Sequence, residues 1–227
     1  MLPLGGIWRH TKTCQYSNSQ STLRRVDVQS GQVLQRYNVD SEYFAEGLTY
    51  YEPRSGQGRL LQLTWKAGVV FLYDAKKFTL LEQRSVVNAT TNGEGWGICH
   101  VASEDIFYVS DGTQYLHKWN ESTLQLIDKV EVTYQEANSA LRTQNRLTEL
   151  EYDIHSGTVL ANVWYANYIV RIDPSTGFIT HRYDLTMLYR GIGGDVLNGM
   201  IAITDIPNEI WVTGKDWAYM YLIRLID

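Results

Sequence analysis

The sequence predicts an all-β protein, a five-bladed β-propeller formed by a single domain over residues 1–227. The first observation is a short apolar strand, Phe44–Tyr50, with a carboxylate near its start and a glycine directly after it. Three later segments repeat this pattern and align four residues at intervals of 50, 52 and 50: Glu46, Trp96, Thr148 and Asn198. A period near 50 is typical of radial repetition with one four-stranded sheet per repeat. The aligned residues are therefore expected to surround one end of a common axis.

A second set of strands follows the first set at a similar spacing. Each of these strands ends in Asp or Asn, and the copies are Leu23–Asp27, Val70–Asp74, Leu116–Asn120, Ile169–Asp173 and Ile223–Asp227. Ser-Gly or Thr-Gly comes shortly after the first and fourth copies, which is the chemistry of a tight turn. Five copies predict five blades.

The third observation is a further strand of alternating apolar residues after each of the first four copies. These strands are Val33–Val39, Leu80–Val86, Leu124–Val130 and Phe178–Leu185. No helical periodicity of useful length competes with the strand pattern. The polar stretch Tyr134–Asn145 is expected to be a long loop with at most one helical turn.

The two ends of the chain do not complete the pattern. The fifth repeat stops at its third strand, and propellers commonly take the missing outer strand from the N-terminus. Here Gly5–Trp8 is expected to be the first inner strand and Thr11–Tyr16 the second, which leaves no segment to close the ring. The prediction is therefore a propeller whose N-terminal closing strand is missing and whose last blade has an open edge.

Composition and charge limit the classes of function. A net charge of −5 and a pI near 5.5 do not favour nucleic-acid binding. No apolar run approaches the roughly 18 residues that a membrane helix needs, and Met1–Gly6 lacks the features of a signal peptide. Cys14 and Cys99 show no ligand spacing and the five His are scattered, so we expect no metal site. Whether the two cysteines pair is left open.

The second strand of each repeat is expected to end at the same rim as the aligned inner-strand residue. The rim then gathers Glu46, Trp65, Trp96, Asp111, Thr148, Trp164, Asn198 and Lys215. An aromatic wall with one carboxylate and one ammonium is typical of a small-molecule pocket. A carboxylate among Trp rings is expected to have a raised pKa, which suits general acid–base catalysis. Lys215 opposes that shift if it is close, and it can stabilise an oxyanion.

Each of these residues also has a structural interpretation. The Trp side chains can be packing between blades, and Glu46 and Lys215 can be ordinary surface charges. Asp111, followed by Gly112, is typical of a turn. Glu149 and Glu151 can form an acid–base pair, although a structural acceptor role for one of them is the simpler interpretation.

Seven motifs in collinear order carry a resemblance to a known family over roughly residues 20–227. They are Asp40–Thr49, Gly95–Gly97, Ser110–Thr113, Leu147–Tyr152 with Ala161–Trp164, Arg171–Pro174, Val196–Gly199 and Val212–Trp217. In these motifs the chain resembles the plant- and bacterial-type glutaminyl cyclases, or glutaminyl-peptide cyclotransferases, which are five-bladed propellers.

The resemblance implies an enzyme that converts the N-terminal glutamine of peptides or proteins to pyroglutamate and releases ammonia, without a metal or organic cofactor. It places the catalytic residues at Glu46 and Lys215. It places substrate-binding residues at Phe44, Trp65, Trp96 and Trp164, to which we add the aligned rim residues Thr148 and Asn198. Lys215, Thr148 and Trp N–H groups are then expected to stabilise the oxyanion. It also favours the secretory pathway or an extracytoplasmic location. We expect a monomer, with no nucleic-acid or membrane partner.

Two positions depart from the family pattern. Thr148 stands where the family has Asn, and Gly5 is the best match to a family Gln. These departures favour an alternative, a non-catalytic propeller that binds peptide N-termini. A second alternative is a calcium-dependent propeller hydrolase with Glu46, Asn198 and Asp111 as oxygen ligands, against which the nearby Lys215 ammonium argues.

Overall fold

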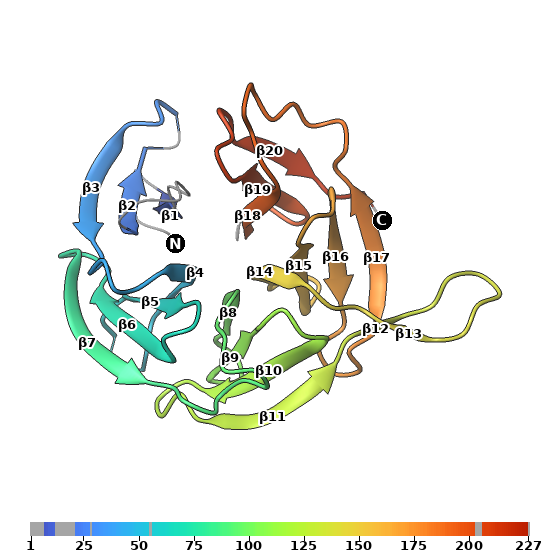
Figure 1. The fold of residues 1–227 in the computed structure, drawn as a ribbon, viewed down its shortest axis with the longest axis horizontal. Coiled ribbons are helices and arrows are strands. Elements are labelled where there is room, and N and C mark those ends of the chain that lie inside the picture. Colours follow the sequence, from blue (N-terminus) through green and yellow to red (C-terminus); the bar gives the residue numbers. More distant parts are fainter. Residues whose placement is uncertain (1–6, 12–20, 28, 55, 203–205, 227) are drawn as a thin grey trace.

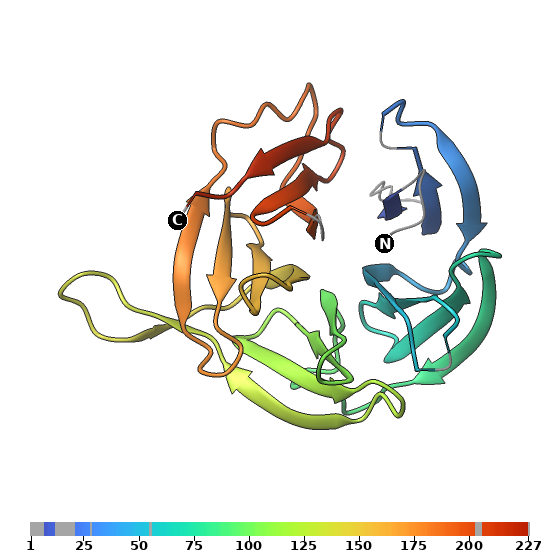
Figure 2. The same ribbon diagram turned by 180° about the vertical axis from the view of Figure 1, so that it is seen from behind.

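The computed structural model describes residues 7–11, 21–27, 29–54, 56–202 and 206–226. In these residues all of the regular secondary structure is β-strand, which confirms the all-β prediction. Antiparallel sheets of three or four strands follow one another around a common centre, like the blades of a propeller (Figure 1). The arrangement seen from behind shows the same order of sheets around the ring (Figure 2).

Three of the sheets have four strands, and their strands follow the chain order from the centre outward. The strands are β4 (Ala45–Tyr51), β5 (Arg59–Thr64), β6 (Val69–Asp74) and β7 (Thr79–Ser85); β8 (Ile98–Val101), β9 (Ile106–Val109), β10 (Tyr115–Asn120) and β11 (Leu126–Glu131); and β14 (Leu147–Asp153), β15 (Thr158–Val163), β16 (Tyr168–Ile172) and β17 (Ile179–Asp184).

Two further sheets have three strands each in the described part of the chain. They are formed by β1 (Ile7–Thr11), β2 (Thr22–Val26) and β3 (Val33–Asn38), and by β18 (Leu197–Ala202), β19 (Glu209–Gly214) and β20 (Tyr221–Arg224). The last sheet lacks an outer strand within the described residues, as the sequence predicted.

The first sheet corrects the expected positions of the N-terminal strands. β1 pairs directly with β2, from Ile7 against Val26 to Thr11 against Thr22. In the second sheet, for example, the strand that ends in Asp is β6, and it pairs with the second strand β5 and not with the inner strand β4. Ile7 and Trp8 therefore lie in a second strand, and the expected second strand Thr11–Tyr16 lies outside the described residues after Thr11.

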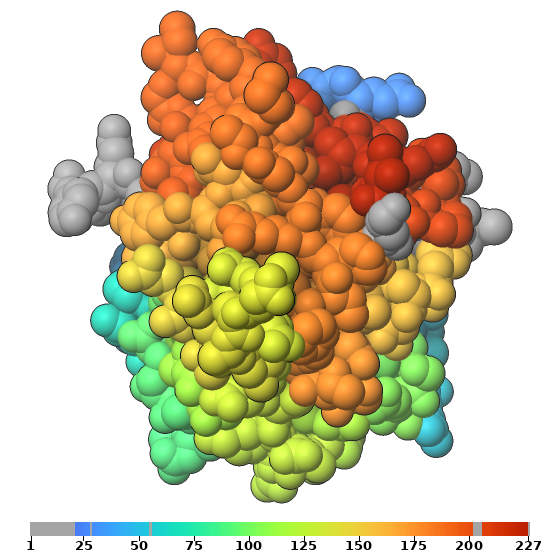
Figure 3. Space-filling view, turned by 90° about the vertical axis from the view of Figure 1, so that its right-hand side faces the viewer, coloured from blue at the N-terminus to red at the C-terminus, as the bar shows by residue number. Residues whose placement is uncertain are grey.

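The stretch Tyr134–Asn145 is mostly loop, as predicted, but it also includes short strand segments that the prediction did not contain. It contains a two-stranded ribbon of β12 (Thr133–Tyr134) and β13 (Arg142–Thr143), and no helical turn is present in it. The ribbon projects outward from the outer edge of the ring (Figure 1), and it lies on the outer surface that faces the viewer in Figure 3. Local polarity predicted an irregular loop, whereas the two arms of the loop pair with each other.

In four sheets the Asp or Asn at the end of the third strand has a structural role, because its side-chain Oδ1 accepts a backbone N–H of the following turn. The backbone carbonyl accepts the N–H of the residue four positions later in four turns, which begin at Asp27, Asp74, Asn120 and Asp173. That later residue has a positive φ in every case: Gly31, Phe78, Leu124 and Gly177. Phe78 and Leu124 adopt a conformation that costs a non-glycine residue about 1–2 kcal/mol. Burial of their side chains, which are 7% and 2% exposed, offsets this cost.

The core consists of apolar layers between consecutive sheets. One layer packs Leu63 and Val70 against Ile98 and Trp119 of the following sheet, and three similar layers join the other neighbouring pairs. Each fully buried Leu or Ile contributes about 1.5–3 kcal/mol. Middle strands such as β5 and β6 are buried on both faces, whereas the outer strands β7 and β11 are exposed.

Candidate active site

Three inner strands carry one extra residue at the same place. From Ala45 to Leu48 the pairing advances three residues on β4, while β5 advances only two, and β14 and β18 show the same shift. The bulged residues are Glu46–Gly47, Thr148–Glu149 and Asn198–Gly199. A bulge bends the strand and changes the direction of its side chains, and bulges are frequent next to active sites.

Trp96 and Gly97 have an equivalent arrangement just before β8. The Trp96 N–H donates to the Ser110 carbonyl at 2.9 Å, and the Ser110 N–H donates to the Gly97 carbonyl at 2.9 Å, so two residues oppose one. The four aligned residues therefore hold equivalent positions at the start of the inner strands, as the 50-residue period predicted.

Hydrogen bonds between sheets bring these positions together. The Gly47 N–H donates to the Trp96 carbonyl at 2.7 Å. The Ser110 hydroxyl donates to the Thr148 carbonyl at 2.9 Å, and the Gly199 N–H donates to Oδ1 of Asn162 at 3.1 Å. The contacts link the β4, β8, β14 and β18 sheets in sequence, so that residues about 50 positions apart meet at one rim.

Aromatic rings form a wall along this rim. The rings of Phe44 and Trp65 are 5.7 Å apart between centroids, and those of Trp96 and Trp164 meet edge to face at 5.4 Å. Tyr165, which sequence analysis did not select, stacks on Trp164 at 4.4 Å and is 68% exposed. The three Trp side chains are half-buried, so each keeps part of its surface accessible.

A carboxylate that sequence analysis missed joins two of these rings. Oε2 of Glu94 accepts the indole N–H of Trp65 at 2.8 Å and that of Trp96 at 2.8 Å. The expectation that these two indole groups donate to an oxyanion is therefore replaced, because both donors are paired with Glu94. The sequence shows that Glu94 lies two residues before the aligned Trp96. It does not show that Glu94 also binds Trp65, which belongs to another sheet.

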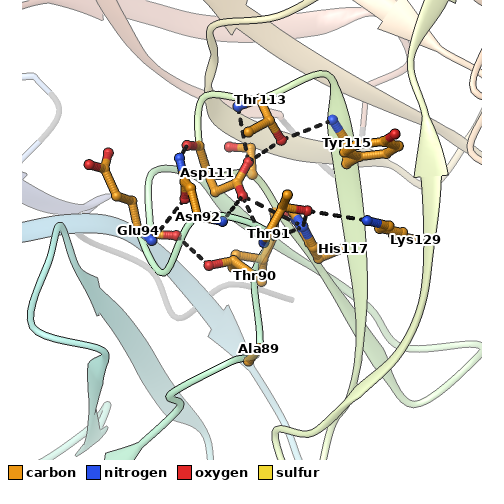
Figure 4. A network of polar contacts seen from close by, with 12 residues as sticks. Ala89, Thr90, Thr91, Asn92, Glu94, Asp111, Thr113, Tyr115, His117 and Lys129 are labelled. Carbon is orange, nitrogen blue, oxygen red and sulfur yellow. Dashed lines mark hydrogen bonds and ion pairs between the residues drawn. The ribbon is translucent and has the colours of Figure 1, made fainter.

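A polar network centred on the buried Asp111 and His117 side chains supports the loop that carries Glu94 (Figure 4). Oδ2 of the fully buried Asp111 accepts the backbone N–H groups of Thr91 and Asn92 at 3.0 and 3.3 Å, and its Oδ1 accepts the Thr113 N–H at 3.0 Å. Nε2 of His117 lies 3.0 Å from the Thr91 N–H. Burial lowers the pKa of His117, which suits a neutral ring that accepts at Nε2. Asp111 is thus an organiser of the loop, in line with its structural interpretation.

Glu46 and Lys215 are both half-buried and lie at the ends of strands on the same rim. Glu46 is the second residue of β4, and Lys215 directly follows β19. The Lys215 N–H donates to the Val196 carbonyl and its carbonyl accepts the Asp195 N–H, both at 2.9 Å. These two bonds hold Lys215 beside the start of β18, the strand that carries Asn198.

The amide side chains near Thr148 have unused hydrogen-bonding capacity. The Thr148 hydroxyl donates to the Asn162 carbonyl at 3.4 Å, so its single donor is directed into the protein. Nδ2 of the fully buried Asn162 and Oδ1 of Asn198 are buried without a partner in the described part of the chain. Buried polar atoms of this kind are costly, and a bound polar ligand could satisfy them. Gly5, the other departure from the family pattern, lies outside the described residues.

The acidic pair on β14 has one strongly perturbed member. Burial, then the charges of Glu149 and Asp153, raise the pKa of Glu151 to about 8. Burial also raises the pKa of the nearby Cys99 thiol, which pairs with no cysteine in the described part of the chain. Cys14 lies outside the described residues.

Within the same described ranges, no three His, Cys, Asp or Glu side chains gather closely enough to hold a metal ion. No helix there is long and apolar enough to span a bilayer.

Comparison with known proteins places these observations in a family context. The profile of a family described as glutamine cyclotransferase matches residues 13–225. The glutaminyl-peptide cyclotransferase of Arabidopsis thaliana is 32% identical over 212 residues, which are 91% of this chain and 60% of the relative. The chain thus spans about 60% of the length of this curated relative.

Two solved structures are similar to the chain. The crystal structure of Myxococcus xanthus glutaminyl cyclase matches with a TM-score of 0.75 and 28% identity, covering 91% of this chain and 84% of that protein. A Bacteroides caccae protein of unknown function matches with a TM-score of 0.50 and 7% identity, over 92% and 65% of the two chains. The second likeness concerns the fold alone.

Proposed function

The chain belongs to the glutamine cyclotransferase family, and we propose that it converts the N-terminal glutamine of peptides or proteins to pyroglutamate. In this reaction the α-amine nitrogen attacks the side-chain amide carbon and a new C–N bond forms. The bond between that carbon and the amide nitrogen then breaks, and ammonia leaves. One proton must move from the attacking nitrogen to the leaving nitrogen.

The aromatic wall addresses the first physical difficulty of this reaction. The amine reaches the carbonyl only in a bent conformation that closes a five-membered ring. Apolar surfaces of Trp65, Trp96 and Trp164 can hold the side chain in that near-attack geometry, which lowers the entropic part of the barrier. The half-buried state of these rings supports this role, because each retains a surface for a ligand.

Glu46 addresses the second difficulty, the proton transfer. A free amide anion is too basic to leave, so the leaving nitrogen must be protonated. Glu46 accepts the proton from the attacking amine and returns it to the leaving nitrogen. The observation that carries this proposal is the bulge at Glu46–Gly47, which joins the carboxylate-bearing segment to Trp96 through a 2.7 Å hydrogen bond.

The negative charge that forms on the carbonyl oxygen must also be stabilised, and a positive charge and an amide group are proposed for this role. Lys215 supplies an ammonium, and Asn198 supplies an amide beside it. Phe44 extends the wall at the side of Trp65. The Thr148 hydroxyl is directed to a backbone carbonyl, so we assign Thr148 a smaller part in binding than the family's Asn has.

We extend the proposal to the architecture and partners. The sheets around the ring support a five-bladed propeller that forms one domain, with the two three-stranded sheets as the first and the last around the ring. Peptides with N-terminal glutamine are the proposed partners, and we propose that the protein acts as a monomer without a nucleic-acid or membrane partner.

A mass assay on a Gln-initiated peptide tests the proposal, because cyclisation removes the mass of one ammonia. Glu46→Gln keeps the shape of the side chain and removes its basicity, so kcat should fall by about 10²–10⁴-fold with peptide binding retained. Glu52→Gln is the matched control, since Glu52 lies just past the far end of the same strand. Cyclisation by Glu46→Gln at the parental rate would disprove the role of Glu46. A parent that binds the peptide and never cyclises it would favour the binding alternative.

A further inference from the structure

We propose that Glu94 is a positioning residue that sets the orientation of the Trp65 and Trp96 rings in the aromatic wall. The effect of Glu94 on catalysis rests on the proposed cyclisation. The effect of Glu94 on the orientation of the two rings does not depend on that proposal. Glu94 lies on the connection between β7 and β8, outside the aligned repeat positions.

The geometry at the carboxylate is the first step of the argument. A single oxygen, Oε2, accepts two indole N–H groups at 2.8 Å each. Both are hydrogen bonds to an ionised acceptor, which are stronger than neutral ones. Trp65 follows β5 and Trp96 precedes β8, so one carboxylate joins side chains from two sheets.

The backbone around Glu94 is held on both sides, which makes the carboxylate a fixed reference point. The Glu94 N–H donates to Oδ1 of Asn92 at 2.9 Å, and the Glu94 carbonyl accepts the Thr90 hydroxyl at 2.9 Å. The next N–H, of Gly95, donates to the Trp65 carbonyl at 2.9 Å. Asn92 in turn donates through Nδ2 to the Asp111 carbonyl at 2.8 Å (Figure 4).

The rings need such a reference because the outer torsion of a Trp side chain is broad. Packing limits the Trp96 ring on one face, where a Cβ at Gly112 would lie 2.6 Å from it. The edge-to-face contact with Trp164 limits it on another side. The hydrogen bond from the indole N–H to Glu94 then selects one orientation of the Trp96 ring. That orientation decides which surface of the ring faces a ligand.

The second carboxylate oxygen has a different environment. Nζ of Lys66 lies 3.5 Å from Oε1 of Glu94 and 4.0 Å above the centre of the Trp65 ring. The Lys66 side chain is 60% exposed, whereas Glu94 is 21% exposed. An exposed pair of this kind is weak, so the two indole bonds are the main interactions of the carboxylate.

NMR of the indole N–H groups tests the positioning without reference to activity. The chain has seven Trp, and Trp65→Phe and Trp96→Phe identify the two resonances by their loss. In the Glu94→Ala variant, the indole N–H resonances of Trp65 and Trp96 should both shift toward higher field. In the Glu52→Ala variant they should stay in place. A spectrum in which Glu94→Ala moves neither resonance, or only one of them, would overturn the proposal.

Kinetics on the Gln-peptide then separates positioning from a purely structural role. Glu94→Ala should lower kcat/KM by about 10²-fold, because small misplacements of orienting groups have effects of that size, and most of the loss should be in kcat. Glu94→Gln keeps an oxygen that can accept both N–H groups, so it should recover at least tenfold of the loss. Equal losses in the two variants would contradict the positioning role. A parent without cyclisation activity would count against the proposed function, and the NMR result would still decide the role of Glu94.

Discussion

Gly97→Ala should be among the most damaging single-methyl substitutions in this protein. A Cβ at position 97 would lie 1.7 Å from the Thr148 carbonyl oxygen, 2.7 Å from its carbonyl carbon and 2.9 Å from the Leu150 nitrogen. All three are backbone atoms, so no side chain can turn away. Because an ordinary carbon–oxygen contact is about 3.3 Å, the β8 and β14 strands must separate by about 1.6 Å.

The cost can be worked out from the contacts that are lost. Separation breaks the 2.9 Å bond from the Ser110 hydroxyl to the Thr148 carbonyl and disturbs the 3.0 Å bond from the Gly97 N–H to that hydroxyl. Each bond contributes about 1 kcal/mol, and forced overpacking costs about 1–3 kcal/mol. The total is about 3–5 kcal/mol. At about 2–4 °C per kcal/mol for a chain of this size, Tm should fall by about 6–20 °C.

Gly93→Ala is the matched control for thermal unfolding followed by circular dichroism. Gly93 has a φ of +79° and nothing within 4 Å of a built Cβ, so alanine there has only the backbone cost of about 1–2 kcal/mol. Its Tm should therefore fall by only about 2–8 °C. If the two variants melt at the same temperature, the close approach of Gly97 to Thr148 does not hold the sheets together as argued.

Three other predictions concern side chains near the rim. Lys215→Ala should lower kcat on a Gln-peptide by about 10²–10³-fold, as for a lost oxyanion donor, and an unchanged kcat would remove Lys215 from the mechanism. Thr148→Asn should leave kcat/KM equal or higher, because the amide reaches further and has two donor hydrogens; a tenfold loss in a normally folded variant would contradict this. The pKa of Glu151 is raised to about 8 by burial, then by Glu149 and Asp153, so its neutral form stabilises the fold and that contribution is lost as pH rises from about 4.5 through 8. Glu151→Gln should therefore raise Tm relative to the parent more at pH 9 than at pH 5, and a Tm difference independent of pH would show that Glu151 does not titrate in this way.

From Leu23 onward, the sequence by itself determined the main strands and their periodicity. Strand residues alternate locally, and turns depend on a few neighbouring residues, as at Asp74, whose carbonyl accepts the N–H of Phe78. A repeat near 50 residues then placed Glu46, Trp96, Thr148 and Asn198 at equivalent points, because equivalent strands in a radial array meet at one rim.

Only the tertiary structure decided how those side chains are directed and what they bind. The extra residue at Glu46–Gly47 depends on the register with β5, and the direct pairing of β1 with β2 depends on a choice between segments far apart in the chain. The role of Glu94 depends on Trp65, which lies 29 residues earlier in a different sheet. Register and contacts between sheets result from packing of the whole ring, and no local pattern of residues encodes them.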